Sequence, residues 1–193
     1  MLERRAMDTF LISMLLTFAI ALGGREQLVV AQFSDAVGRS VPLLLTGIAC
    51  AAVSAGVMGW AGWSVAAMLP DRAADMLVAI ALAIAAFELS WEVKLKDMKE
   101  PTRSYVAIAV VLFVRQAMDA ARFVIFALAA QAVYPVTIII GGALGGAAAV
   151  ALGWMLGKRK IKRLPLRAIR LLFAFITIVS ALFIGLSARY AVY

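Results

Sequence analysis

Long runs of apolar residues, separated by short polar connections, dominate the pattern of hydrophobic and polar positions along this chain. Six apolar segments can be distinguished, at residues 8–33, 41–69, 74–93, 104–131, 135–157 and 171–188. An α-helix needs about 20 apolar residues to cross the hydrocarbon core of a bilayer, and the runs lack the alternation that is typical of barrel strands. The pattern therefore predicts an all-α polytopic membrane protein with six transmembrane helices.

The composition agrees with this class. The chain has 193 residues, of which 65% are hydrophobic and 16% are charged, whereas a soluble domain is about half apolar and about a quarter charged. Six spans leave no length for a separate soluble domain, so we expect a single transmembrane domain over residues 1–193. Residues 3–21 have the charge pattern of a signal peptide, but the apolar run continues beyond them, which favours a retained helix.

The net charge of +8 comes from Lys and Arg that gather in the connections 94–103 and 158–170. With six crossings these connections share one side of the membrane with Arg39, and basic loops mark the cytoplasmic side. We therefore expect both termini outside, against the signal of Arg4 and Arg5, in a bacterial inner membrane. The expected partner is the lipid bilayer and not nucleic acid; headgroup binding by the 158–170 connection is an alternative.

The residue types that are missing restrict the chemistry. The chain has no histidine and a single cysteine, Cys50, which excludes His-based catalysis, His metal ligands and an intrachain disulfide. The sequence contains no Gly-rich phosphate loop and no recognisable nucleophile–base pair. We therefore expect no enzymatic activity and no cofactor, and any metal ion would be bound by oxygen ligands or at most by Met sulfur.

Small residues recur at helical spacing in two of the segments. Gly56, Gly59 and Gly62 lie in the second segment, and pairs of glycines four residues apart lie between residues 141 and 157 in the fifth. Such patterns let helix backbones approach closely in a membrane. They predict tight helix packing, with a homodimer interface as an alternative use of the same residues.

The chain also divides into two halves of three spans, at residues 8–93 and 104–189, joined by a linker at 94–103. Each half opens with the span that contains charged residues. Because three crossings separate these two spans, the second half is inverted relative to the first. Inverted repeats are a transporter architecture in which the substrate site lies at the repeat interface near mid-membrane.

The first charged span is interrupted by Gly23 and Gly24, after which Arg25, Glu26 and Gln27 follow directly. A charge inside a span costs about 2.5–3.5 kcal/mol on insertion scales, so it persists when it is paired, hydrated or functional. A broken helix would free backbone carbonyls, and Glu26 would add a hard oxygen ligand. The alternative is that Arg25 and Glu26 lie at the membrane interface of a long span.

The second charged span contains Arg115, Gln116, Asp119 and Arg122. Spacings of three and four residues place them on one face of a continuous helix. They predict either part of a substrate path or a self-neutralised ladder of ion pairs that binds nothing.

Glu88 stands at the end of the third segment, one helical turn before Glu92 and close to Lys94 and Lys96. We expect a surface cluster of ion pairs here, with a cytoplasmic vestibule for cations as the alternative.

With these motifs in view, residues 7–13 leading into 22–28 resemble uncharacterised protein family 0016, which comprises the Golgi-type calcium/manganese transporters and their bacterial relatives. Each repeat of that family contains the motif Glu-x-Gly-Asp-Lys/Arg-Ser/Thr. The glycines at 145–157, the run Arg163-Leu164-Pro165-Leu166-Arg167 and the apolar last segment resemble its second half. The resemblance implies two inverted three-helix repeats that exchange divalent cations for protons.

The motifs of this chain depart from the family pattern. In the first repeat Ala21 and Gly24 stand where the motif has Glu and Asp. In the second repeat Gln116 replaces the Glu, whereas Asp119 matches the Asp. One of four motif carboxylates remains, together with a displaced Glu26. A second, weaker resemblance links the Arg-Glu pair of the first repeat to the Arg-Glu-Gly-x-Glu motif of iron permeases.

These observations predict a secondary transporter of divalent cations such as Mn²⁺ or Ca²⁺, in exchange for protons. We expect Glu26 and Asp119 to bind the metal ion. The rest of the expected substrate path consists of two glutamines that supply neutral oxygens and three arginines that hold the carboxylates: Gln27, Gln116, Arg25, Arg115 and Arg122. The rival hypotheses are an iron-permease-like cation transporter and a membrane scaffold or subunit that does not transport.

Overall fold

The computed structural model describes residues 2–91, 104–161 and 165–190, and these residues form helices and connections without any strand. The helices in chain order are α1 (Leu2–Ala21), α2 (Arg25–Val37), α3 (Val41–Ala67), α4 (Asp71–Ser90), α5 (Tyr105–Ala117), α6 (Ala120–Ala130), α7 (Pro135–Ile161) and α8 (Leu166–Tyr190). The expected all-α class is confirmed for this part of the chain.

Among the described residues, four helices are long and apolar enough to cross a membrane, namely α3, α4, α7 over residues 135–158, and α8. The pair α1 and α2 meets the same requirement as one broken span that is bent by 62°. Large apolar side chains such as Phe175 and Phe183 are exposed on the outer surface of α8, as lipid-facing residues are. The chain is therefore a multi-pass integral membrane protein.

The first break lies where the glycine pair predicted it. Gly23 has a φ of +70°, a left-handed conformation that favours glycine. The Gly24 N–H donates to the Ala21 carbonyl at 2.9 Å, which closes the turn before α2 begins. The missing side chain at Gly23 also admits α8, because a Cβ there would lie 3.1 Å from Leu166 and 3.3 Å from Arg170.

The second break was not predicted, because the 104–131 segment was expected to be one continuous helix. Instead α5 ends at Ala117 and α6 begins at Ala120, with Asp119 in an extended conformation between them. The Asp119 carbonyl accepts the N–H of Arg122 at 2.9 Å, so this residue occupies the N-cap position that aspartate favours. The expectation that Arg115, Asp119 and Arg122 share one helix face is therefore wrong.

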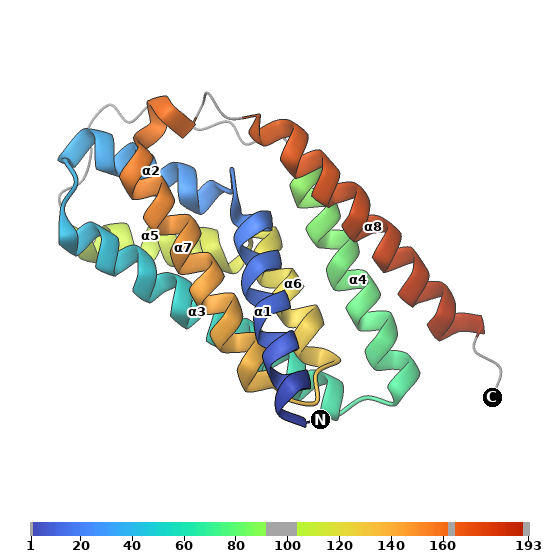
Figure 1. Cartoon of the computed structure of the whole chain (residues 1–193). Helices are drawn as coiled ribbons and strands as arrows, with labels where there is room; N and C mark the ends of the chain where they lie inside the picture. The colour runs from blue at the N-terminus through green and yellow to red at the C-terminus, as the bar shows by residue number, and fades with distance from the viewer. Residues whose placement is uncertain (1, 92–103, 162–164, 191–193) are drawn as a thin grey trace.

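The helices form two groups (Figure 1). The first group contains α1, α3, α6 and α7, with the short α2 against α7 and the short α5 against α3. The second group is the pair of α4 and α8, which lie along each other and meet the first group mainly through α6. The end of α1 and the start of α6 lie side by side near the middle of the molecule, so the two breaks are neighbours.

Glycines permit the closest approaches inside the first group. A Cβ at Gly62 of α3 would collide with the backbone carbonyl of Phe126 in α6, and one at Gly145 of α7 would collide with the carbonyl of Met14 in α1. Gly56 differs, because no atom lies within 4 Å of the position of its missing Cβ. The predicted packing role of the glycines is thus confirmed at Gly62 and Gly145 but is wrong for Gly56.

The contrast within α3 gives a test. Gly62→Ala should lower the stability of the protein by about 1–3 kcal/mol, because the methyl group forces α3 away from α6. Gly56→Ala is the matched control and should leave stability unchanged or raise it slightly, since alanine favours helix by up to about 1 kcal/mol. Thermal unfolding in detergent measures both, and equal melting temperatures for the two variants would contradict the packing.

Candidate functional site

The two helix breaks bring the two predicted ligand carboxylates into the interior. Glu26 lies in the first turn of α2 and is 0% exposed, and Asp119 stands at the N-cap position of α6, without a side-chain cap hydrogen bond, and is 1% exposed. The breaks lie against each other, since a Cβ on Gly24 would be 3.5 Å from Oδ2 of Asp119. A Cβ at this point would be in ordinary van der Waals contact with the carboxylate, and its closer contact would be with the Ala21 carbonyl at 3.0 Å.

A buried ion pair joins the two broken helices. The Arg122 Nη2 of α6 donates to Oε2 of Glu26 at 3.2 Å, and both side chains are fully buried. The Arg122 Nε donates to Oγ of Ser54 in α3 at 2.7 Å, and this Oγ lies 3.2 Å from Oε1 of Gln116 in α5. Gly146 of α7 makes room for the guanidinium, because a Cβ there would be 3.1 Å from Nη1.

Several polar atoms of this cluster have no hydrogen-bond partner within the part of the chain that the structure describes. They are Oε1 of Glu26, both carboxylate oxygens of Asp119, Nη1 of Arg122 and Nε2 of Gln116. A buried polar group without a partner costs about 1–3 kcal/mol, and a charged group costs more. Such a concentration of unpaired atoms is unusual in a folded interior, and it makes the two breaks the candidate functional site of this chain.

The amide oxygen of Gln27 was expected to face the substrate path, but it is bound to the backbone. Its Oε1 accepts the N–H of Gly23 at 2.7 Å, and its Nε2 donates to the carbonyl of Ala149 in α7 at 3.1 Å. The side chain thus satisfies a backbone donor that the first break exposes and holds α2 against α7. Gln27 therefore stabilises the first break, whereas Oε1 of Gln116 lies near Ser54 beside Arg122.

Two of the three predicted arginines do not hold Glu26 or Asp119. The Nε of Arg25 lies 3.7 Å from Oε1 of Glu88, and its side chain is 44% exposed. Arg115 is exposed on α5 and forms no ion pair within the described residues. Successive residues of a helix point about 100° apart, which separates Arg25 from Glu26, and the second break turns α5 away from Asp119. Arg122 alone pairs with a predicted ligand.

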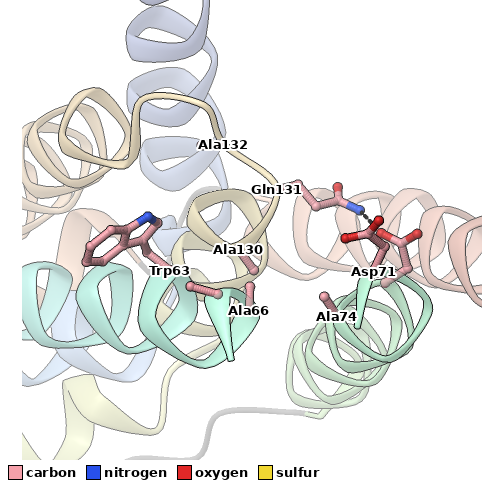
Figure 2. Close-up of a pocket in the computed structure, with 9 residues that line it drawn as sticks. Trp63, Ala66, Asp71, Ala74, Ala130, Gln131 and Ala132 are labelled. Atoms are coloured by element: carbon pink, nitrogen blue, oxygen red, sulfur yellow. Dashed lines mark hydrogen bonds between the residues drawn. The ribbon is translucent and has the colours of Figure 1, made fainter. Parts of the chain in front are cut away.

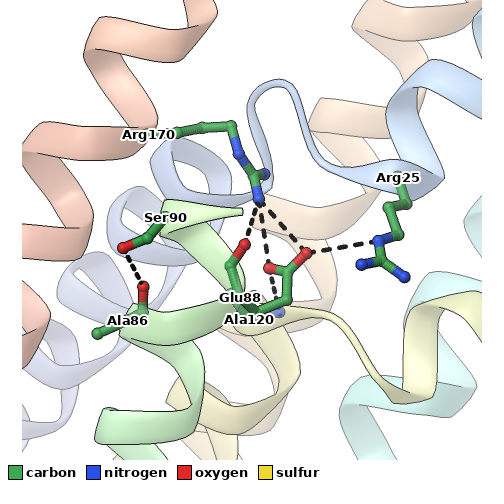
Figure 3. A network of polar contacts seen from close by, with 6 residues as sticks. All are labelled: Arg25, Ala86, Glu88, Ser90, Ala120 and Arg170. Carbon is green, nitrogen blue, oxygen red and sulfur yellow. Dashed lines mark hydrogen bonds and ion pairs between the residues drawn. The ribbon is translucent and has the colours of Figure 1, made fainter. Parts of the chain in front are cut away.

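Glu88 of α4 links three other helices beside the breaks (Figure 3). The Arg170 Nη2 of α8 donates to Oε1 of Glu88 at 3.3 Å and to its backbone carbonyl at 3.0 Å. The N–H of Ala120, the first residue of α6, donates to Oε2 of Glu88 at 3.2 Å. Together with Arg25 of α2, these contacts fix the start of α6 next to Asp119.

Sequence reasoning missed this junction. It expected a surface cluster in which Glu88 pairs with lysines of the following connection, but Glu92, Lys94 and Lys96 lie outside the described residues. The partners that the structure gives to Glu88 are Arg25 and Arg170. The position of Glu88 at the end of a span was the available signal. Its partner Arg170 looked like one more basic loop residue, although it is only 6% exposed.

The described residues contain no group of three or more His, Cys, Asp or Glu side chains that could hold a metal ion. A divalent cation at the breaks would therefore take Glu26 and Asp119 together with neutral oxygens. The unpaired Oε1 of Glu26 and the two unpaired oxygens of Asp119 are hard ligands of the kind that Ca²⁺, Mg²⁺ and Mn²⁺ prefer. The residues present thus fit a weak site better than a rigid metal centre.

An open hollow of about 490 Å³ lies at the far end of α6, between the end of α3 and the start of α4 (Figure 2). It is lined by alanines and by Trp63, Asp71, Asp75 and Gln131, and the Nε2 of Gln131 donates to Oδ1 of Asp75 at 3.2 Å. Asp71 and Asp75 give this hollow a negative charge that favours cations. It lies beyond the opposite end of α6 from Asp119.

The fold and this buried cluster define a class, that of multi-pass α-helical membrane proteins with charged residues in their interior. Comparison with protein family models, with curated proteins and with solved structures finds no match to this chain. Its function therefore has to be argued from the site.

Loss of the Glu88 contacts should destabilise the protein. Glu88→Ala leaves the buried Arg170 without its carboxylate, so the free energy of unfolding should fall by about 3 kcal/mol. Asp8→Ala removes an exposed acid from α1 and should change this free energy by less than about 0.5 kcal/mol. Thermal unfolding in detergent compares the two, and similar losses would show that the Glu88 junction has no special structural role.

Proposed function

We propose that the protein is a secondary membrane transporter that exchanges a divalent metal cation for protons, and that Glu26 and Asp119 are its ion-binding carboxylates. One observation is the main support: two fully buried carboxylates lie at the breaks of two helices and keep unpaired oxygens. Ionisable residues inside a membrane are costly, and in transporters they mark the ion pathway. Substrate sites at discontinuous helices near mid-membrane are a feature of secondary transporters.

The same carboxylates suit proton coupling. A buried carboxylate is stable when it binds a cation or when it is protonated, and it is costly when it is bare. Release of the metal ion on one side of the membrane therefore favours uptake of a proton. Because one group serves both ions in turn, the two fluxes are coupled without any covalent intermediate.

The order of the helices supports a repeat architecture. A broken helix followed by two long helices occurs twice, as α1/α2, α3 and α4, and as α5/α6, α7 and α8. In this proposal α5 and α6 together form a crossing, which gives six crossings and two inverted repeats. The start of α1 and the end of α8 lie at the end of the molecule opposite the end of α7 and the start of α8 (Figure 1). The basic connections would then face the cytoplasm of a bacterial cell, and the hollow between α3, α4 and α6 would face outside.

A scaffold without transport activity is the second candidate, and the Arg122–Glu26 pair favours it, because this pair neutralises one carboxylate internally. A fully self-neutralised interior would also pair Asp119 with Arg115. That pair is absent among the described residues, and both Asp119 oxygens are unpaired. Transport accounts for Asp119 and the scaffold does not.

Transport in proteoliposomes tests the proposal. Glu26→Gln and Asp119→Asn should each reduce Mn²⁺ flux driven by a pH gradient by at least about tenfold, because each removes one of the two charged ligands. Asp8→Asn, which removes an exposed acid of α1, is the control and should retain flux. Protein content and melting temperature are measured in the same preparations. Wild-type flux in both site variants would refute the assignment, and no flux of Mn²⁺, Ca²⁺ or Fe²⁺ in the wild type would favour the scaffold.

A further inference from the structure

We propose that the hollow between α3, α4 and α6 is a binding site for an organic cation, that is, for an ammonium group attached to an apolar body. This inference goes beyond the proposed transport function and does not depend on it. The hollow has a volume of about 490 Å³, which lies within the range of about 300–1,000 Å³ that is typical of small-molecule sites. Because the hollow is open, a ligand can enter it without any rearrangement of the helices.

The hollow combines one aromatic side chain with small apolar ones. Trp63 lies on one side and Asp71 and Gln131 lie on the other, with alanines between them (Figure 2). Trp63 is 47% exposed, so its indole is accessible to a ligand. The face of an aromatic ring attracts an ammonium group within about 6 Å, and tryptophan does so most strongly. The alanines leave the space that the apolar body of such a ligand would fill.

Two carboxylates of α4 line the hollow and are not neutralised. The Nε2 of Gln131 donates to Oδ1 of Asp75 at 3.2 Å, but this amide is uncharged. Within the described part of the chain, neither Asp71 nor Asp75 forms an ion pair, and no lining residue is basic. Arg72 follows Asp71 in sequence but does not line the hollow. A positively charged ligand is therefore the kind that the hollow favours.

The ends of two helices add to this negative potential. Ala66 and Ala67 at the end of α3 and Ala130 at the end of α6 line the hollow. The C-terminal end of a helix has a partial negative charge of about half an elementary charge, and neither helix has a basic residue in its last turn to offset it. Asp71 lies in the first turn of α4 and balances the positive end of that helix. Asp75 and the two helix ends thus remain as an excess of negative charge.

The apolar lining favours an organic cation over a metal ion. A divalent ion such as Ca²⁺ or Mg²⁺ takes about six or more oxygen ligands, some of them waters, and it gains nothing from a tryptophan and alanines. An ammonium ion with an apolar body gains from both parts of the lining, because its charge lies near the acids while its body covers Trp63 and the alanines. The site is separate from the helix breaks, since Asp119 precedes α6 and the hollow lies at the other end of this helix.

Isothermal titration calorimetry of the intact protein in an uncharged detergent tests the proposal, with benzyltriethylammonium as the probe and protein-free micelles as the blank. The wild type should bind the probe, and binding should weaken as the salt concentration rises, because the hollow is open to solvent. Benzenesulfonate, an aromatic anion, should not bind. Equal binding of this anion would overturn the proposal, and so would displacement of the probe by an equimolar amount of Mn²⁺, which would make the hollow a vestibule for metal ions.

Substitutions in the lining provide the second arm. Asp75→Asn should weaken probe binding about fivefold, because it removes one charge near the ammonium group in a solvated site. Trp63→Leu should weaken it about threefold through loss of the aromatic face. Ala74→Leu places a larger side chain in the hollow and should abolish measurable binding. Trp60→Leu is the matched control, since Trp60 precedes Trp63 by three residues and is 63% exposed but does not line the hollow, and it should bind the probe as the wild type does.

The outcomes also separate this site from the helix breaks. Glu26→Gln and Asp119→Asn should bind the probe with wild-type affinity, because these carboxylates lie at the other end of α6. Loss of probe binding in these two variants, together with normal binding in Asp75→Asn, would place the cation at the breaks and overturn the proposal. Wild-type affinity in all three lining variants would overturn it as well. An absence of Mn²⁺ flux would refute the transport function alone.

Discussion

The buried ion pair between Arg122 and Glu26 is the contact on which the interior depends. It joins α6 to α2, and through Ser54 it also reaches α3 and α5. Removal of either partner would leave an uncompensated charge in a low-dielectric interior, which is strongly destabilising. Glu26 and Arg122 each lie in the first turn of the helix that follows a break, and there their side chains meet.

A break in a helix leaves backbone N–H and carbonyl groups without their helical partners, and nearby side chains of this protein bind some of them. Gln27 accepts the N–H of Gly23, and Glu88 accepts the N–H of Ala120 at the start of α6. In lipid, each unsatisfied backbone group costs several kcal/mol. Gln27 and Glu88 are therefore needed for structure. In contrast, Oε1 of Glu26 and both carboxylate oxygens of Asp119 have no hydrogen-bond partner among the described residues.

Sequence patterns predicted the long helices and the first break well, because apolar length and a glycine pair are local signals. The second break escaped prediction, since no glycine or proline marks it and the N-cap character of Asp119 was its sole local sign. Glu26 and Asp119 could be selected as charges inside spans. Their partners could not be assigned, because the Arg122–Glu26 and Arg170–Glu88 contacts join residues that are 96 and 82 positions apart.

The pairing of α4 with α8 has a mechanical consequence. This pair meets the other helices mainly through α6 and at Glu88, whose partners adjoin the two buried carboxylates in sequence: Arg25 precedes Glu26, and Ala120 follows Asp119. Any displacement of the α4–α8 pair must therefore break the Glu88 contacts or move both carboxylates with it. Glu88 is thus the contact through which a movement of α4 and α8 is transmitted to both carboxylates.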